Sequence, residues 1–380
     1  DYVSADALLN MLSVKDGNLI TESGMNYKAL YFGKGAGKVT LPVLKKTLEM
    51  VNQGVVLIGK KPDGSPSLSD NPEEVEEVIN ILWPGDDVAT VGKGKVYNTD
   101  DPAVALKEIG LEADFTYKSS MDDSNVMFIS RKLNNGAIYF VASLKDQEET
   151  IEASFRISGF KAELWDPATG SIEPVSYTSD GKRTNVTIPL DRLGSVFVVF
   201  SEKTKARSVT LPIPSEQLVK QIEGPWLVEF QAERGAPASA TFEKLIDFRE
   251  SSDPGIRYFS GIATYVKDVD ISREVVDKGS ILIDLGQVYN LAEVWVNGKL
   301  AGTTWKPPYR IDITDFVTEG SNKIEIKSVN TWVNRLIGDA QPGVKDKVTL
   351  TTRDFYNANS PLVPSGLLGP VKIMNKFIAN

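Results

Sequence analysis

The spacing of apolar residues changes at about residue 118, and this change constrains the fold more than any other feature of the sequence. Before it, short apolar runs alternate with segments of helical spacing; after it, apolar and polar residues mostly alternate. A helix repeats every 3.6 residues and a strand every two, so neither pattern suits the other structure. We therefore expect an α/β region followed by β-sheet regions, and 380 residues suffice for two or three domains.

The first region, residues 1–117, alternates predicted strands and helices. In the segment 40–54, Thr40 suits an N-cap and Gly54 suits a C-cap. The nearly all-apolar run 55–59 is typical of a buried parallel strand. Further strands are expected at 28–33 and 95–97, and further helices at 71–83 and 102–109. This βαβα order predicts a small parallel-sheet α/β domain of the flavodoxin-like or amidotransferase-like kind.

The rest of the chain is predicted to be β. Six short strands in residues 118–202, separated by turn signals, indicate a small antiparallel β-sandwich. Residues 203–222 are polar, contain two prolines and indicate a linker. Residues 223–380 contain short strands and little helix, with a strong hairpin signal at Asn297-Gly298, and they predict a jelly roll.

Two residue types are absent, because the sequence contains no cysteine and no histidine. Without cysteine, disulfides, thiolate nucleophiles and Cys-ligated metal sites are excluded. Without histidine, Ser-His-Asp catalysis and the usual general base at neutral pH are excluded. An amidotransferase-type domain would therefore lack its nucleophile and base here. Any catalysis has to use carboxylates, lysine, tyrosine, serine or threonine.

The charge balance argues against two classes of partner. The 42 basic and 51 acidic residues give a net charge of 42 − 51 = −9, and an acidic surface repels nucleic-acid phosphates and anionic membranes. No stretch approaches the roughly 20 apolar residues that a membrane helix needs. We therefore expect no nucleic-acid partner and no membrane span.

Two features that could suggest catalysis are weak. The loop Gly33-Lys-Gly-Ala-Gly-Lys38 precedes a predicted helix, but its glycine spacing fits neither the phosphate-loop nor the dinucleotide pattern, so we expect a plain turn. Asp284 and Glu293 lie on apolar strands, and glycoside hydrolysis uses two carboxylates. Their spacing does not demonstrate a pair, and solvated strand faces are the simpler interpretation.

A more specific pattern joins aromatic, arginine and asparagine side chains in the segments 305–310 and 330–335. The first, Trp-Lys-Pro-Pro-Tyr-Arg, places two rings and an arginine on a loop stiffened by prolines. Aromatic rings bind the C–H faces of sugars, and arginine and asparagine bond their hydroxyls. The alternative is that the tryptophans fill the sandwich core and the arginines pair with acids. The expected carbohydrate-binding side chains are Trp305, Tyr309, Arg310, Asn330, Trp332, Asn334 and Arg335.

These segments belong to a series of motifs that carries a family resemblance. Tyr258-Phe-Ser-Gly-Ile-Ala-Thr-Tyr-Val, Ile283-Asp-Leu-Gly-Gln-Val-Tyr-Asn-Leu-Ala-Glu-Val-Trp-Val-Asn-Gly-Lys and Trp305-Lys-Pro-Pro-Tyr-Arg-Ile-Asp-Ile-Thr-Asp resemble the galactose-binding-like, sugar-binding jelly roll of family 2 glycosidases. Asn330-Thr-Trp-Val-Asn-Arg-Leu-Ile-Gly-Asp339 and Pro364-Ser-Gly-Leu-Leu-Gly-Pro370, with Glu163-Leu-Trp-Asp-Pro-Ala-Thr-Gly170 earlier, are similar to the C-terminal part of α-L-rhamnosidases of glycoside hydrolase family 106.

The resemblance implies a non-catalytic role for this chain. In that family the catalytic carboxylates lie on a (β/α)₈ barrel upstream of the segment similar to Asp1-Tyr-Val-Ser-Ala-Asp, and no barrel of about 250 residues is present here. The chain opens without Met and without a signal segment, and we expect it to have been cut from a longer polypeptide. The resemblance therefore assigns no catalytic residue to this chain. It implies an accessory role beside the barrel.

Partners and location also follow from the resemblance. The expected partners are a rhamnose-containing oligosaccharide or polysaccharide and the missing upstream barrel, and the expected location is periplasmic or secreted. No cofactor is expected; jelly rolls of this type often hold a structural Ca²⁺, but no oxygen-ligand loop is specific enough to name. Two other functions stay open, namely a stand-alone carbohydrate-binding or scaffold protein and an independent hydrolase that uses Asp and Glu.

Overall fold

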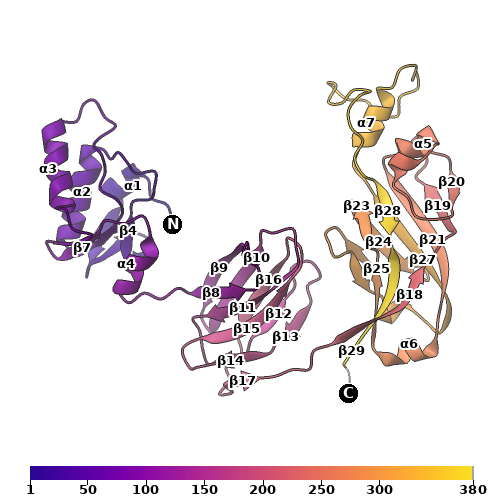
Figure 1. Cartoon of the computed structure of the whole chain (residues 1–380), viewed down its shortest axis with the longest axis horizontal. Coiled ribbons are helices and arrows are strands. Elements are labelled where there is room, and N and C mark those ends of the chain that lie inside the picture. The colour runs from indigo at the N-terminus through magenta and orange to yellow at the C-terminus, as the bar shows by residue number, and fades with distance from the viewer. Residues whose placement is uncertain (379–380) are drawn as a thin grey trace. The chain divides into compact units, whose positions relative to one another are not determined.

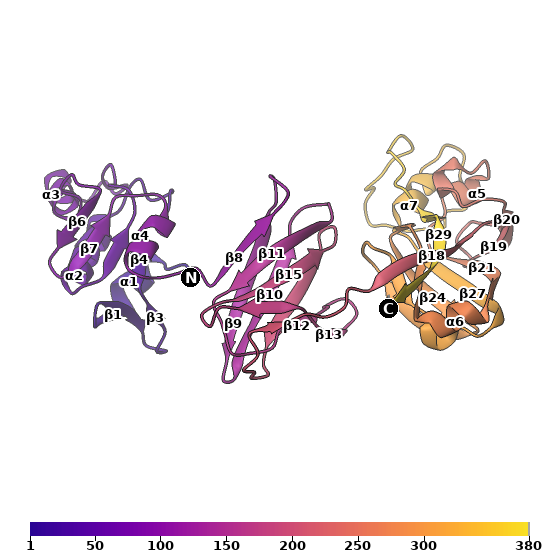
Figure 2. The ribbon, with the colours of Figure 1, turned by 60° about the horizontal axis from the view of Figure 1, so that its bottom comes forward.

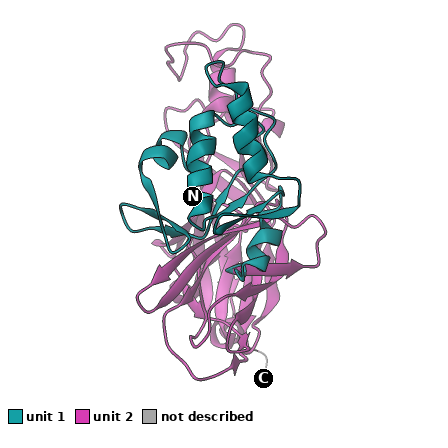
Figure 3. Cartoon of the chain, turned by 90° about the vertical axis from the view of Figure 1, so that its left-hand side faces the viewer, with its two compact units in different colours: residues 1–114 teal, residues 115–380 magenta. Residues whose placement is uncertain are grey.

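A computed structural model describes residues 1–378 of the chain. Two compact units divide it, residues 1–114 and residues 115–380 (Figure 3). Strands make up most of the regular structure, and helices are concentrated in the first unit.

The first unit combines a four-stranded sheet with helices and a three-stranded meander. In the order β4-β5-β7-β6, the first three strands are parallel neighbours and β6 pairs antiparallel with β7. The parallel strands follow the predicted alternation, and β6 adds an antiparallel edge that the sequence pattern did not reveal. The elements are α1 (Ala5–Asn10), β1 (Leu12–Lys15), β2 (Asn18–Thr21), β3 (Asn26–Tyr27), β4 (Ala29–Tyr31), α2 (Leu41–Asn52), β5 (Val56–Ile58), α3 (Pro72–Leu82), β6 (Val88–Val91), β7 (Gly94–Tyr97) and α4 (Pro102–Glu108).

Helix α2 is capped by a group that lies outside it. Thr40 occupies the N-cap position as predicted, but its side chain makes no capping hydrogen bond. The carboxylate of Asp70, 29 residues away, accepts a hydrogen bond from the Leu41 amide at 2.8 Å instead. At the other end, Gln53 is the C-cap, and the predicted Gly54 follows it with a φ of +114°. The backbone pattern was therefore correct, and the identity of the capping group was not visible from it.

Residues 115–209 form two five-stranded antiparallel sheets that pack as a sandwich (Figure 2). The sheet orders are β13-β12-β16-β10-β9 and β17-β14-β15-β11-β8. Tyr139, Phe155 and Phe200 meet edge to face in the core, with the first two ring centroids 4.8 Å apart. The strands are β8 (Phe115–Ser119), β9 (Val126–Leu133), β10 (Gly136–Ser143), β11 (Glu149–Phe155), β12 (Glu163–Trp165), β13 (Ile172–Pro174), β14 (Tyr177–Ser179), β15 (Thr184–Leu190), β16 (Ser195–Phe200) and β17 (Ser208–Val209).

An apolar row crosses the outer face of the first of these sheets. Successive cross-strand pairs join Ile129 to Phe140, Phe140 to Phe197, Phe197 to Trp165 and Trp165 to Ile172. The two isoleucines at its ends are 59% and 55% exposed. We call this set the outer apolar row; it places hydrophobic side chains on all five strands of one sheet.

The remaining strands build a jelly roll. Its main sheets have the orders β20-β19-β21-β27-β24-β25 and β18-β29-β22-β26, and β23 pairs with β28. One large buried cluster, which includes Trp226, Tyr265 and Ile326, fills the space between them. The elements are β18 (Ser215–Ile222), β19 (Trp226–Phe230), β20 (Ser239–Phe242), α5 (Pro254–Arg257), β21 (Ile262–Ile271), α6 (Arg273–Lys278), β22 (Ser280–Asp284), β23 (Gln287–Tyr289), β24 (Leu291–Val296), β25 (Lys299–Thr304), β26 (Arg310–Asp312), β27 (Gly320–Val329), α7 (Val333–Asp339), β28 (Gly366–Gly369) and β29 (Val371–Phe377), with short 3₁₀ turns at Phe248–Glu250 and Thr314–Phe316.

The structure agrees with the predicted hairpin and differs from the predicted linker. Asn297 and Gly298 connect β24 to β25 with φ values of +52° and +78°, as a tight hairpin turn requires. Residues 203–222 were predicted to be a linker, but Ser215–Ile222 form strand β18, which pairs with β29. Most side chains of β18 are exposed, so this strand lacks the apolar alternation by which a strand is recognised in a sequence.

Candidate functional site

Loops from five neighbouring strands meet at one end of the jelly roll. Thr304 of β25 pairs with Ala292 of β24, which pairs with Ser328 of β27, and Val329 of β27 pairs with Ile262 of β21. The loops that follow β25, β27 and β19 and that precede β24 and β21 therefore leave the same sheet edge. Helices α7 and α5 lie at this end and α6 lies at the opposite one (Figures 1 and 2). We call it the α7 end.

The segment after β25 supplies two of the predicted aromatic side chains. Trp305 directly follows β25 and is 60% exposed. The ring of Tyr309 packs against the jelly-roll core, and its hydroxyl donates to the Asn290 carbonyl oxygen at 3.5 Å. Burial raises the pKa of the Tyr309 phenol, so it stays a neutral donor at physiological pH. The sequence alternative in which Trp305 fills the core is not what the structure shows.

Arg310 is paired with acids, as the sequence alternative allowed. Its Nε donates to Asp284 Oδ2 at 2.8 Å, and its Nη1 lies 3.2 Å from Glu216 Oε2. Asp284 faces Arg310 across the β22–β26 ladder, which fixes the geometry of the pair. Two carboxylates on one guanidinium leave little of its charge for a ligand.

The segment after β27 presents a second tryptophan together with an arginine that the sequence analysis missed. Trp332 is 44% exposed, and the guanidinium carbon of Arg234 lies 4.9 Å from its ring centroid. Arg234 belongs to the β19–β20 loop, whose sequence Ala-Glu-Arg-Gly contains no recognisable signal. Only the strand order, in which β21 alone separates β19 from β27, brings the two residues together.

The other three predicted side chains hold the α7 end together. Asn330 accepts from the Gly261 amide at 2.9 Å and donates to the Phe259 carbonyl at 2.8 Å. Asn334 is fully buried and makes hydrogen bonds in both directions with the Val363 backbone, at 2.8 and 2.9 Å. Their amides are engaged with the protein itself.

Arg335 is 7% exposed and pairs with Asp339, whose Oδ1 lies 3.1 Å from its Nη2. Asp339 also accepts hydrogen bonds from the backbone and side chain of Thr349, at 2.7 and 2.6 Å. The pair therefore anchors α7 to the loop that follows it. The side chain of Arg335, like those of Asn330 and Asn334, bonds to other groups of the protein and stabilises the fold.

The two carboxylates considered for catalysis do not meet. Asp284 belongs to β22 and Glu293 to β24, which lie in different sheets. Asp284 is occupied by Arg310 and by the Gly286 amide, and Glu293 accepts from the Trp295 indole at 3.1 Å. The loop at 33–38 forms a turn in which the Ala36 amide donates to Gly33 O at 2.9 Å.

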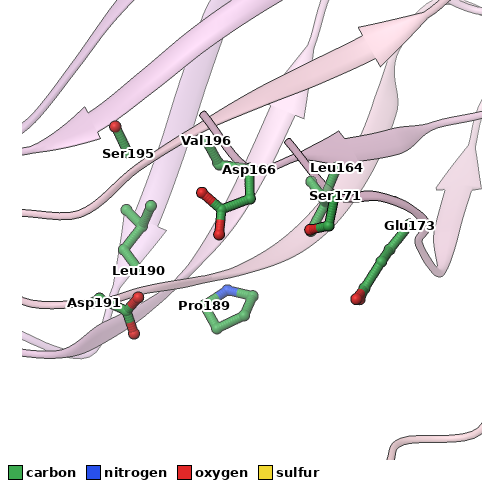
Figure 4. Close-up of a pocket in the computed structure, with 9 residues that line it drawn as sticks. All are labelled: Leu164, Asp166, Ser171, Glu173, Pro189, Leu190, Asp191, Ser195 and Val196. Carbon is green, nitrogen blue, oxygen red and sulfur yellow. The ribbon is translucent and has the colours of Figure 1, made fainter. Parts of the chain in front are cut away.

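The β-sandwich carries two further hollows. The smaller, about 190 Å³, is bordered by Asp166, Glu173 and Asp191 and has no aromatic lining (Figure 4). The larger, about 780 Å³, runs along the second sheet, where exposed Glu152 and Asn185 are among its lining residues. Its two lining rings are the half-buried Tyr117 and the buried Tyr177, whereas the tryptophans of the α7 end are exposed, so the α7 end is the better candidate for binding a sugar.

Within residues 1–378, no three His, Cys, Asp or Glu side chains are grouped so that they could hold a metal ion. No helix among these residues combines the length and the apolar character that crossing a bilayer requires.

Comparison with known proteins finds two segments of the chain that match glycoside hydrolase families. Residues 1–179 match the family model described as alpha-L-rhamnosidase, and residues 220–359 match the sugar-binding domain of family 2 glycosyl hydrolases. These matches confirm the two resemblances that the motifs indicated. The chain is therefore similar to glycoside hydrolases over both of these segments.

Two individual proteins extend this result. The rhamnosidase from Novosphingobium sp. PP1Y superposes on 98% of the chain with a TM-score of 0.85 and 40% sequence identity. A Formosa agariphila protein with a provisional beta-glucuronidase name is 35% identical over 194 residues, or 45% of this chain. This chain spans 36% of the rhamnosidase and 16% of the Formosa protein.

Proposed function

We propose that the chain is a non-catalytic portion of an α-L-rhamnosidase-like glycoside hydrolase acting on plant-type polysaccharide. It braces a catalytic barrel carried elsewhere in the polypeptide and binds carbohydrate at the α7 end. The observation that supports this most directly is the superposition on 98% of the chain, which accounts for only 36% of the solved rhamnosidase. The remaining length of such a protein is ample for a (β/α)₈ barrel of about 250 residues.

The chemistry of the α7 end supports sugar binding. The exposed indoles of Trp305 and Trp332 offer apolar faces to the C–H side of a pyranose ring. From the register, Trp305 and Asn330 leave the sheet edge two strand spacings apart, roughly 10 Å, which suits two adjacent sugar residues. The rhamnosidase and glucuronidase names of the two relatives both denote enzymes that act on saccharides. We propose that this chain meets its polysaccharide outside the cytoplasm, in the periplasm or after secretion.

Replacing Trp305 with alanine tests the binding role. Loss of one stacking ring removes about 1 kcal/mol of binding free energy, so affinity falls by roughly five- to tenfold. Isothermal titration of the chain with rhamnogalacturonan-type oligosaccharides measures this. Trp295→Ala serves as the control, because that ring lies on a strand face under Lys327 rather than at the α7 end. Equal affinity of Trp305→Ala and the parent chain excludes stacking by this ring.

A stand-alone carbohydrate-binding protein is the second candidate. It is favoured by the fact that both exposed tryptophans belong to this chain and need no other domain to be presented. The native gene distinguishes the two: a signal sequence running directly into Asp1 supports the binding protein, and several hundred upstream residues support the enzyme. Release of rhamnose from an aryl rhamnoside by the purified chain would contradict both and support an independent hydrolase.

A further inference from the structure

We propose that Arg234 and Trp332 form a subsite that binds the acidic group of a charged saccharide, either the carboxylate of a uronic acid or a sulfate ester. This inference rests on the proposed carbohydrate-binding function and names the class of sugar that the α7 end prefers. Three observations carry it: an arginine without an acidic partner, its fixed position and the ring that it covers.

Arg234 has no acidic partner within residues 1–378. Its guanidinium contacts the Trp332 ring, its Nε is buried without a hydrogen-bond partner, and it takes part in no ion pair. The two arginines predicted to bind sugar differ, since Arg310 contacts two carboxylates and Arg335 contacts Asp339. A half-buried guanidinium that has lost part of its hydration gains most from an anionic ligand.

The position of Arg234 is fixed before any ligand binds. A Cβ added to Gly261 would lie 3.3 Å from Arg234 Cγ, so the arginine stem packs directly on this glycine. Asn330 holds the Gly261 amide at 2.9 Å and, two residues further on, leads into Trp332. Because the arginine stem is held against this backbone, binding costs little side-chain entropy at Arg234.

A second guanidinium lies near Arg234. A Cβ added to Gly235 would lie 2.8 Å from Nη1 of Arg335, so that group lies close to the residue that follows Arg234. Asp339 pairs with Arg335, and the exposed Glu233 precedes Arg234 in the chain. Arg234 is therefore the guanidinium of this group that has no ion pair in the described residues, and it is the one that a ligand anion would meet.

The geometry selects a saccharide rather than a nucleic acid. The planar donors of a guanidinium match the paired oxygens of a carboxylate or sulfate. Arg234 covers one face of the Trp332 ring, and the exposed part of the ring is free to contact the pyranose that carries the acidic group. A polynucleotide would need a row of cations, and the net charge of −9 opposes it.

The test compares matched ligands on the full chain. Titrations use an oligosaccharide of alternating rhamnose and galacturonic acid, the same compound with its carboxylates methyl-esterified, and a sulfated oligosaccharide of equal length. We expect the acid to bind at least about tenfold more tightly than its methyl ester, with a preference that weakens as salt is added. The third ligand shows whether carboxylate or sulfate is the better fit.

Three variants decide whether Arg234 is responsible. Arg234→Gln is expected to reduce the affinity for the acid to that for the ester and to leave the ester unchanged, and Arg234→Lys is expected to be intermediate because it keeps the charge but not the planar donors. Arg353→Gln is the matched control, since Arg353 also lies over a ring, Phe355, at 4.7 Å but is exposed.

Equal affinity for acid and ester, or an equal effect of Arg234→Gln and Arg353→Gln, would overturn the subsite. If the ester binds in a Trp305-dependent manner without any preference for the acid, the subsite fails and the carbohydrate-binding function stands. If no saccharide binds, both fail. Thermal unfolding of each variant shows that the fold is retained.

Discussion

At the scale of the residue, single polar side chains at the ends of elements determine how loops are held. Asp70 caps α2 from a distant loop, and it accepts a second hydrogen bond from Ser65 Oγ at 2.5 Å. Asn334 holds the segment at Val363 in a similar way, through two hydrogen bonds to its backbone. Asn334 was predicted to contact sugar, because its amide suits hydroxyl groups. The structure shows that it is buried, which a single sequence does not reveal, and its hydrogen bonds to the backbone give it a structural role.

The cap at Asp70 predicts an acid-sensitive first unit. Hydrogen bonds from the Leu41 amide, and then from Ser65, lower the pKa of this carboxyl. A group whose pKa is lowered by folding contributes stability above its unfolded pKa of about 3.9, and the contribution is lost as pH falls through the lower folded value. Asp70→Asn should therefore destabilise the first unit at pH 7 and lose its effect in strong acid.

Denaturant unfolding of the first unit between pH 7 and pH 2 measures this, with amide exchange at Leu41 as the local probe. Asp63→Asn is the control, because Asp63 is an exposed acid in the same loop that makes no side-chain contact with α2. The same pH dependence in both variants would show that Asp70 is not the cause.

At the scale of the element, strand β9 departs from the usual alternation. It is an edge strand with exposed Met127 and Ile129 on its surface, and the outer apolar row begins on it. Edge strands with apolar surfaces invite pairing with other chains, and contiguous apolar patches invite association. Which residues of β9 face outward depends on the ladder with β10, and a single sequence does not reveal that ladder.

We therefore expect Ile129→Lys to reduce self-association of the purified chain at high concentration. A surface substitution of this kind should change the free energy of unfolding by no more than about 0.5 kcal/mol. Sedimentation velocity over a concentration series measures it. Thr187→Lys, on the exposed side of the other sheet, adds the same charge and is the control. Identical sedimentation of the two variants would show that the outer apolar row does not cause the self-association.

At the scale of the whole molecule, the fold is built from separate cores. The first unit, the β-sandwich and the jelly roll each bury their own cluster of side chains. Periodicity predicted helices α2 and α3 and most long strands within a few residues, because those segments bury one face over many turns or residues. It did not predict β18, or the short meander β1 to β3, because exposed or very short strands carry too few apolar positions.

The candidate site was predicted only in part, because one of its residues is brought there by the order of the strands. Trp305 and Trp332 stand in short motifs that a sequence displays, and both are exposed as sugar contacts require. Arg234 comes from a loop nearly a hundred residues earlier in the chain than Trp332, and only the neighbourhood of β19, β21 and β27 brings it there. Non-local contacts of this kind are set by sheet order, which periodicity does not encode.

Separate cores predict separate responses to core mutations. Leu57, fully buried in β5, belongs to the first unit's cluster, and Leu57→Ala should cost that unit roughly 2–5 kcal/mol. The jelly roll should keep its protection. Hydrogen exchange by mass spectrometry over both units measures this, with Ile326→Ala in the jelly roll as the reciprocal variant. Equal loss of protection in both units would mean that the chain unfolds as one cooperative body.

The pairing of β18 with β29 has a consequence for how the jelly roll can be handled. Ser215 opposes Phe377 in this ladder, so the first strand of the jelly roll and its last run side by side in opposite directions. A short peptide can join these two ends, and the ring so formed can be reopened at the exposed Asn297-Gly298 turn. The α7 end would then keep its loops while the polypeptide begins and finishes elsewhere, which makes this module suited to circular permutation.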